Sequence, residues 1–374
     1  QERGDKIRRG WRVVLRMLTA AAEWTDHRGV GVGVGVGGAS DGVVFVAFAC
    51  ISVIAADLLP YIPDAALPEV VTAVGAFGRQ RADVNTSLTA IGLLWNMTDF
   101  FGRLVDALPE ERGRTIDLAD TGTAAGMAET VMLPLFGVLR DISTDARPEV
   151  RNSGVRTLIS TLVSHGGKLA PSTWRTCLWD VLFPLLERVR QLAGAASTEE
   201  KGAEREVGRQ QGRAVMMLVH HSRNTAQKQW DETLVLSLNG VGRLLRTHLG
   251  AISRLEGFEQ RWESLLLFVT DSVLAGSREV ALAALASMQS ILQAHAGCAA
   301  LPRALWKRSL RVYAAVATQC NTQGSTMGPK TRAEMIASLG RIYVAKRDVF
   351  DESDVRTILG ILDMCARAPN AGVA

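Results

Sequence analysis

Apolar residues recur every three to four positions along most of this 374-residue chain. The first such series comprises Ile7, Trp11, Leu15 and Leu18, a spacing that places apolar side chains on one face of an α-helix. The same periodicity predicts further helices over residues 43–59, 68–77, 87–104, 124–142, 148–165, 172–192, 212–221, 226–248, 258–275, 277–295, 302–320, 331–350 and 353–366. Strand-like alternation is confined to a Gly-Val repeat at 29–37. The pattern therefore predicts an all-α fold.

Successive helices with short connections are typical of repeat arrays, in which each helical pair buries its apolar side against the next. Pro148 lies in the first turn of a predicted helix, where its missing N–H costs nothing, and the apolar spacing after it recurs at 280–288. Pro134 and Pro184 occupy the matching contexts VMLPLF and VLFPLL, and a proline inside a helix bends it. We expect an α-solenoid of HEAT- or armadillo-type helical pairs, with about 12–14 helices.

Three segments interrupt the helical pattern. Residues 26–41 contain the Gly-Val repeat, and because glycine lowers both helix and strand propensity we expect a disordered Gly-Val-rich loop, with a strand hairpin as the alternative. Residues 197–211 are polar and charged, and a third break lies at 321–330. The predicted organisation is a HEAT-like solenoid over 1–196, a charged linker, and a continuing solenoid over 212–374.

The composition is that of a globular protein, because 47% hydrophobic and 21% charged residues do not fit a disordered chain. The net charge is only +4 and no basic stretch is interleaved with aromatic residues, so we expect no nucleic-acid partner. The five cysteines contain no CxxC pair, which argues against a zinc ribbon or a thioredoxin-type site. Residues 43–56 are uncharged but shorter than the ~20 residues of a membrane-spanning helix. We expect a buried helix in a soluble or peripheral membrane protein.

Motifs for catalysis are absent from the sequence, which contains no GxxxxGK[ST] phosphate loop, no HExxH and no GxSxG. His220 and His221 are adjacent, so on a helix they point about 100° apart and cannot share a metal ion. His165 precedes two glycines, and we expect it at a helix C-terminus, where the helix dipole favours a protonated imidazole. We therefore expect a protein that is not an enzyme, with no catalytic residues, no cofactor and no metal site.

Two clusters are candidates for partner binding. Arg8, Arg12 and Arg16 form a basic face that suits phospholipid headgroups or an acidic partner, with a solvated helix face as the alternative. Asn96 and Asp99 are polar residues three positions apart within an apolar segment. Because this spacing places both on one side of a helix, we predict that they are exposed to a partner.

The same segment carries two structural candidates. Trp95 continues a stripe with Leu88, Ile91 and Thr98, which predicts that the indole packs in the core. Its replacement by alanine is then expected to cost about 3–5 kcal/mol through the cavity left behind. Gly92 is expected to permit close contact with a neighbouring helix.

The segment 87–100 (SLTAIGLLWNMTDF) resembles a signature of the Mon-two family, named for monensin sensitivity. The segment 6–11 (KIRRGW) resembles a start that this family shares with the large Sec-seven Arf exchange factors. Four further segments are similar to the Mon-two family in the expected order: 147–158 (RPEVRNSGVRTL), 164–169 (SHGGKL), 174–184 (WRTCLWDVLFP) and 220–233 (HHSRNTAQKQWDET).

The resemblance implies a piece from the C-terminal half of a large protein peripheral to trans-Golgi network and endosome membranes. Such proteins resemble the exchange factors outside the catalytic domain, which they lack, and are thought to act as scaffolds in endosome–Golgi trafficking. The implied partners are a Dopey-like protein, an aminophospholipid flippase and an Arf-like GTPase. Two alternatives stay open. One is the C-terminal regulatory region of a Sec-seven exchange factor, and the other is a solenoid of the nuclear transport receptor type.

Overall fold

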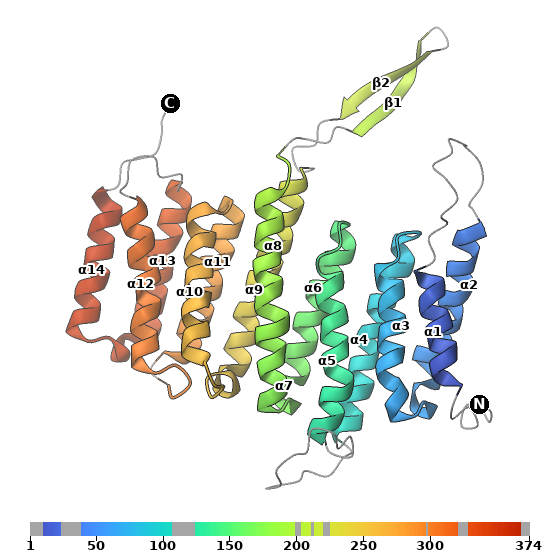
Figure 1. Ribbon diagram of the computed structural model, residues 1–374. Coiled ribbons are helices and arrows are strands. Elements are labelled where there is room, and N and C mark those ends of the chain that lie inside the picture. Colours follow the sequence, from blue (N-terminus) through green and yellow to red (C-terminus); the bar gives the residue numbers. More distant parts are fainter. Residues whose placement is uncertain are drawn as a thin grey trace. The chain divides into compact units, whose positions relative to one another are not determined.

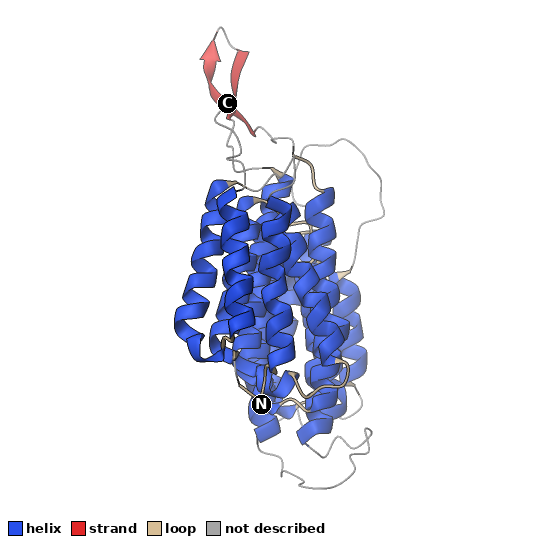
Figure 2. Cartoon of the chain, turned by 90° about the vertical axis from the view of Figure 1, so that its left-hand side faces the viewer, coloured by secondary structure: helices blue, strands red, loops and turns tan. Residues whose placement is uncertain are grey.

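The computed structural model describes residues 10–23, 39–106, 124–198, 203–210, 213–219, 225–296, 298–320 and 328–367. Contacts within the chain define two compact units, Gln1–Leu185 and Leu186–Ala374. Helices dominate the part that is described, and the two strands form a single hairpin (Figure 2). The predicted all-α solenoid is therefore confirmed, with this hairpin as an addition.

The first unit is built from two layers of helices. Its elements are α1 (Trp11–Ala22), α2 (Ala39–Val53), α3 (Leu67–Arg79), α4 (Val84–Asp106), α5 (Ala124–Ile142), α6 (Pro148–His165) and α7 (Pro171–Thr176). One layer contains α1, α3 and α5, each packed on the next, and the other contains α2, α4 and α6 (Figure 1). Contacts between α1 and α2, α3 and α4, and α5 and α6 join the layers. Each pair thus buries its apolar side against the following pair, as in a solenoid.

The second unit repeats the arrangement. After α8 (Phe183–Ala195), which begins at the end of the first unit, come β1 (Ala203–Gln210), β2 (Arg213–Val219), α9 (Ala226–Ile252), α10 (Phe258–Ala275), α11 (Arg278–His295), α12 (Arg303–Cys320), α13 (Pro329–Lys346) and α14 (Glu352–Arg367). One layer runs through α9, α11 and α13, and the other through α10, α12 and α14. The unit boundary at Leu185 differs from the linker expected at 197–211.

The β-hairpin corrects two predictions. Strand β1 occupies most of the segment expected to be a linker, and β2 replaces the helix predicted over 212–221. The strands are antiparallel, with Arg205 opposite Met217 and Gln210 opposite Arg213. A short apolar run such as AVMMLV has no periodicity that distinguishes a helix from a strand. Its pairing with a second strand determines which of the two it forms.

The segment predicted as a loop at 26–41 lies mostly outside the described residues. Its last three residues belong to α2, where the helix begins at Ala39. Helix α2 continues as a π-helical turn at Ile54–Leu58 and a 3₁₀ turn at Leu59–Tyr61. Within the part of the chain that is described, Gly42–Tyr61 is the one stretch with the length and composition to cross a membrane; it has 20 residues and a mean hydropathy of 2.4. Only 33% of its most apolar window is buried, so the prediction of a buried helix is wrong for its outer side.

The three prolines lie in helices, as predicted. Pro148 is in the first turn of α6, and Pro134 lies inside α5. Pro184 lies at the start of α8, directly after a π-helical turn over Cys177–Leu182. Proline has no N–H, so the carbonyl four residues earlier lacks its helical donor. For Pro184 this is the carbonyl of Asp180. Arg140 of α5 donates to that oxygen from Nη1 at 3.1 Å, so a neighbouring helix satisfies the acceptor that Pro184 leaves open.

Buried tryptophans mark the core of each unit. Trp174 in the first unit and Trp262 and Trp306 in the second are almost fully buried. Trp174 Nε1 donates to the carbonyl of Gly166 at 3.0 Å, and Trp262 Nε1 donates to Ser309 Oγ at 3.2 Å. Such an acceptor offsets the cost of burying the indole N–H, whereas Trp306 Nε1 is buried without a hydrogen-bond partner among the described residues.

Candidate functional site

Helix α4 carries the signature segment, and its two sides differ in character. The inner side is packed among neighbouring helices and includes the buried residues Ala90, Ile91, Leu94, Met97, Thr98 and Phe101. The outer side is exposed at a series of positions spaced three or four apart, which we name the α4 stripe: Thr89, Gly92, Asn96, Asp99 and Arg103. This spacing aligns the five positions along one face of the helix.

Asn96 and Asp99 lie where the sequence predicted. Both side chains are exposed, as the sequence predicted, and the binding of a partner to them stays a prediction. The side chain of Asp99 is 53% exposed even though its Oδ1 lies 3.3 Å from Nε2 of His165. Because packing of α4 uses the opposite side of the helix, the fold does not need a polar residue at position 96.

Trp95 and Gly92 differ from their predictions. Trp95 is half-buried rather than in the core, because the most deeply packed face of α4 is centred on Leu94 and Phe101. A cost of 3–5 kcal/mol on truncation is therefore too large for Trp95, since much of the space vacated would be open to water. Gly92 is exposed, and a Cβ added there would meet nothing within 4 Å, so it does not serve close helix contact.

The close contact on α4 lies ten residues later, at Gly102. A Cβ on Gly102 would come within 2.7 Å of Nδ1 of His165, the last residue of α6. Burial, reinforced by the nearby Lys168 ammonium, holds the pKa of His165 below its usual range. The pKa of His165 thus moves opposite to the direction expected from the helix end, because burial and Lys168 outweigh the Asp99 carboxylate.

Three of the family-like segments meet at this end of α4. Lys168 Nζ lies 2.6 Å from Asp106 Oδ2 and donates to the carbonyl of Gly102 at 3.1 Å, which places a cation at the C-terminal end of α4, where the helix dipole favours it. Gly166, two residues before Lys168, accepts the indole N–H of Trp174. Asp99 of the segment 87–100 contacts His165 of the segment 164–169, and the bond to Gly166 joins that segment to 174–184. Sequence spacing gave no sign of this meeting, because more than sixty residues separate Lys168 from its two acceptors.

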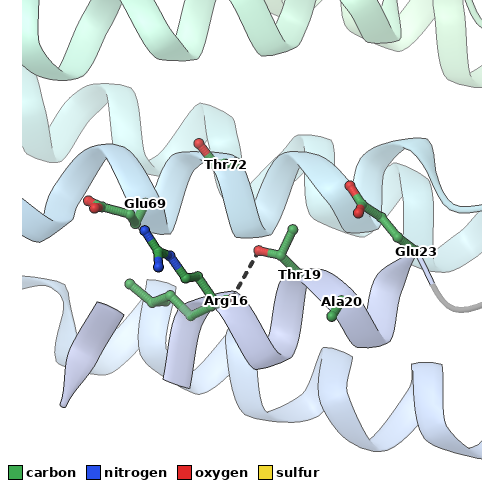
Figure 3. A pocket seen from close by; sticks show the side chains of 7 residues that line it. Arg16, Thr19, Ala20, Glu23, Glu69 and Thr72 are labelled. Atoms are coloured by element: carbon green, nitrogen blue, oxygen red, sulfur yellow. Dashed lines mark hydrogen bonds between the residues drawn. The ribbon is translucent and has the colours of Figure 1, made fainter. Parts of the chain in front are cut away.

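Of the three arginines predicted to bind a partner, the two that the structure describes lie beside acidic side chains. Arg12 Nε lies 3.0 Å from Oε1 of Glu69, which joins α1 to α3. Arg16 is exposed and lines a 270 Å³ pocket between these two helices, together with Glu23, Glu69 and Thr72 (Figure 3). Arg8 lies outside the described residues. The arginines of α1 therefore face acidic side chains of their own protein.

A second polar site, which the sequence did not indicate, lies in the second unit. A pocket of about 600 Å³ opens beside the first turns of α9 and α11, lined by Gln227, Lys228, Asp231, Glu232, Val235, Ser277 and Glu279. Burial and the carboxylate of Glu279 hold the pKa of Asp231 above its usual range. The acidic residues belong to two helices almost fifty residues apart, so only the fold brings them together.

Neither polar site has the arrangement of a metal centre. Among the residues described, no group of three or more His, Cys, Asp and Glu side chains is placed to hold a metal ion. What the α4 stripe offers chemically is a row of hydrogen-bonding and charged groups on a rigid helix. Such a surface recognises another macromolecule by complementarity.

Comparison with known proteins identifies the family. A family model for the C-terminal region of Mon2 protein matches residues 56–338. The chain belongs to the Mon2 family. A MON2 homolog of Drosophila melanogaster is 36% identical over 297 residues, which are 77% of this chain and 16% of the fly protein. The human MON2 homolog is 35% identical over 307 residues, 78% of this chain and 16% of the human protein. The predicted resemblance is confirmed.

More distant relatives are exchange proteins. Brefeldin A-inhibited guanine nucleotide-exchange protein 3 of Arabidopsis thaliana is 25% identical over 220 residues, which are 55% of this chain and 12% of the plant protein. The chain therefore spans less than a fifth of the length of these relatives. The match agrees with the expected relation to the exchange factors.

Proposed function

We propose that this chain is a non-enzymatic scaffold segment that binds protein partners at a membrane surface during vesicle-mediated transport between endosomes and the trans-Golgi network. Membership of the Mon2 family supports the proposal. The observation that carries it is the α4 stripe. Its helix packs mainly through the opposite face, so Asn96 is available for binding, and Asp99 stays 53% exposed although it contacts His165.

The proposed partners are a Dopey-like protein, an aminophospholipid flippase and an Arf-like GTPase, met in the cytoplasm at trans-Golgi and endosomal membranes. A solenoid suits this role because its stacked helices present long, rigid surfaces on which several partners bind side by side. The 600 Å³ acidic pocket of the second unit is a separate surface, suited to a basic segment.

The test replaces one exposed asparagine by arginine in a full-length Mon2-family protein that carries this chain. Asn96→Arg places a long cation on the α4 stripe, and Asn239→Arg makes the same change at an exposed position of α9, as a matched control. The proteins are recovered from cells that lack the endogenous protein, and bound proteins are identified by mass spectrometry. We expect Asn96→Arg to lose at least one of the three proposed partners, while Asn239→Arg keeps them all. Equal recovery with both variants would exclude the α4 stripe as the binding surface.

The second candidate function is the regulatory region of an Arf exchange factor, favoured by the match to the plant exchange protein. It predicts that the full-length protein accelerates nucleotide exchange on an Arf GTPase and that removing this segment changes the rate. The scaffold proposal predicts no exchange activity with or without the segment. Recovery of a nuclear transport GTPase and its cargoes would instead favour the nuclear transport alternative.

A further inference from the structure

Helix α2 is apolar on both its packed and its open side. Its inner side is buried against the rest of the unit, with Ile51 completely enclosed. Its outer side exposes large apolar side chains, with 54% exposure for Phe45 and 68% for Val46, together with Val43 and Val53. A helix that is apolar all round is normally enclosed on all sides, and none of the described elements covers the outer side of α2.

Helix α1, which packs against α2, also exposes apolar side chains. Val13 and Met17 are 60% and 68% exposed, and they lie one helical turn apart. Leu15 between them in sequence is buried against the unit, so the helix separates an inner from an outer apolar side. We name the exposed residues of the two helices the α1–α2 face: Val13, Val14, Met17, Val43, Phe45, Val46, Ala49, Cys50 and Val53.

The α1–α2 face lies at one end of the two helix layers of the unit. Helix α3 packs between α1 and α5, and α4 packs between α2 and α6. Among the described elements, α1 and α2 have such a layer neighbour on one side only, at the end of the unit's row of helices (Figure 1). The exposed side is therefore the one on which the solenoid spacing would place the next pair.

We propose that the α1–α2 face binds a further antiparallel pair of amphipathic helices, supplied by the sequence that precedes this chain in longer Mon2-family proteins. The face is two helices wide and includes both layers, which matches the pairwise contact inside the unit. Its Val, Ala and Phe side chains are of the types that α3 buries between its own neighbours. The match covers only 16% of the fly relative and falls in the C-terminal region of Mon2 protein, so family members carry ample chain before it.

Cys50 provides a native reporter of this contact. Its thiol is exposed on the outer side of α2, whereas Cys298 is exposed in the second unit, and Cys177 and Cys365 are buried. In a full-length family member that carries this chain, each thiol is alkylated and read by mass spectrometry of its peptide. We expect Cys50 to react at least about tenfold more slowly than Cys298, because it would react only when the docked pair opens.

A charged substitution tests whether the face causes the protection. Val46→Glu should restore rapid alkylation of Cys50, while Val344→Glu, at a position 77% exposed on α13, should leave it slow. Cys177 and Cys365 must remain unreactive, which shows that the variant is folded. If Val46→Glu unfolds the chain, Met17→Glu on α1 provides the same test from the other helix.

Three results would overturn the proposal. Cys50 that reacts as fast as Cys298 in the wild-type protein would show an uncovered face. Protection that appears only after vesicles containing phosphatidylserine are added would assign the face to a lipid bilayer. Protection that disappears on dilution would assign it to a second copy of the protein.

Discussion

Helices α2 and α14 each pack on one side against their unit, but their outer sides differ: that of α14 is mostly polar, with Leu359 as an exposed exception, whereas that of α2 is apolar. The inner side of α14 buries Ile361 and Cys365, just as the inner side of α2 buries Ile51. The outer side of α14 carries two ion pairs, each between residues one helical turn apart. Arg356 lies 2.5 Å from Glu352, and Arg367 lies 2.9 Å from Asp363. The outer side of α2 carries valine, phenylalanine, alanine and cysteine.

This difference shows which side chains the stacking of helices requires and which depend on the surroundings of the helix. Stacking fixes only the inner side, since both helices bury apolar residues there. The outer side is free to vary, and it indicates the medium on that side. Charged pairs suit water, as in the polar outer face of a capping repeat, whereas an apolar outer face is suited to another apolar surface.

The largest expected effect tests whether the inner sides are equivalent. Ile51→Ala and Ile361→Ala each remove a fully buried side chain and should each lower the free energy of unfolding by about 2–5 kcal/mol. Urea denaturation of the chain, with hydrogen exchange to locate the loosened unit, measures both. A loss much smaller for Ile51 would show that α2 is held weakly even on its packed side.

The next effect compares a glycine in a helix contact with one on an open face. A Cβ on Gly75 of α3 would overlap the side chain of Val138 of α5, so Gly75→Ala should destabilise by about 1–3 kcal/mol. Gly92→Ala meets open space on α4 and should stabilise by about 0.5–1 kcal/mol, because alanine is the better helix former. Both changes are measured by thermal unfolding. Destabilisation by Gly92→Ala would mean that this position is covered after all.

The helices could be predicted because an inner apolar stripe repeats every three to four residues. Helices α5, α6 and α10 begin and end where the pattern placed them. The hairpin was missed because its strands are defined by pairing across the turn, which a window of residues cannot show. Periodicity also fails on the outer side: 43–56 is uncharged and almost entirely apolar, so its spacing does not distinguish the packed side from the open one.

The candidate site was predictable in part for the same reason. Asn96 and Asp99 were identified because polar residues inside an apolar helix stand out. Trp95 was misplaced because a stripe boundary is uncertain by about one residue, which is 100° around a helix. The contacts of Gly102 with His165 and Lys168 could not be found, because they depend on how α4 lies against the end of α6.

The smallest expected effect concerns the charged outer side of α14. Arg356→Ala should cost only about 0.3–0.5 kcal/mol, because the pair with Glu352 is solvent-exposed and both side chains lose freedom in forming it. A double-mutant cycle with Glu352→Ala, followed by urea denaturation, isolates the coupling, and about 1 M salt should remove it. On α2, Val46→Ala should show no such dependence on salt, since no charge is involved. A coupling that survives high salt would mean that the pair is shielded from solvent and that α14, like α2, has a partner on its outer side.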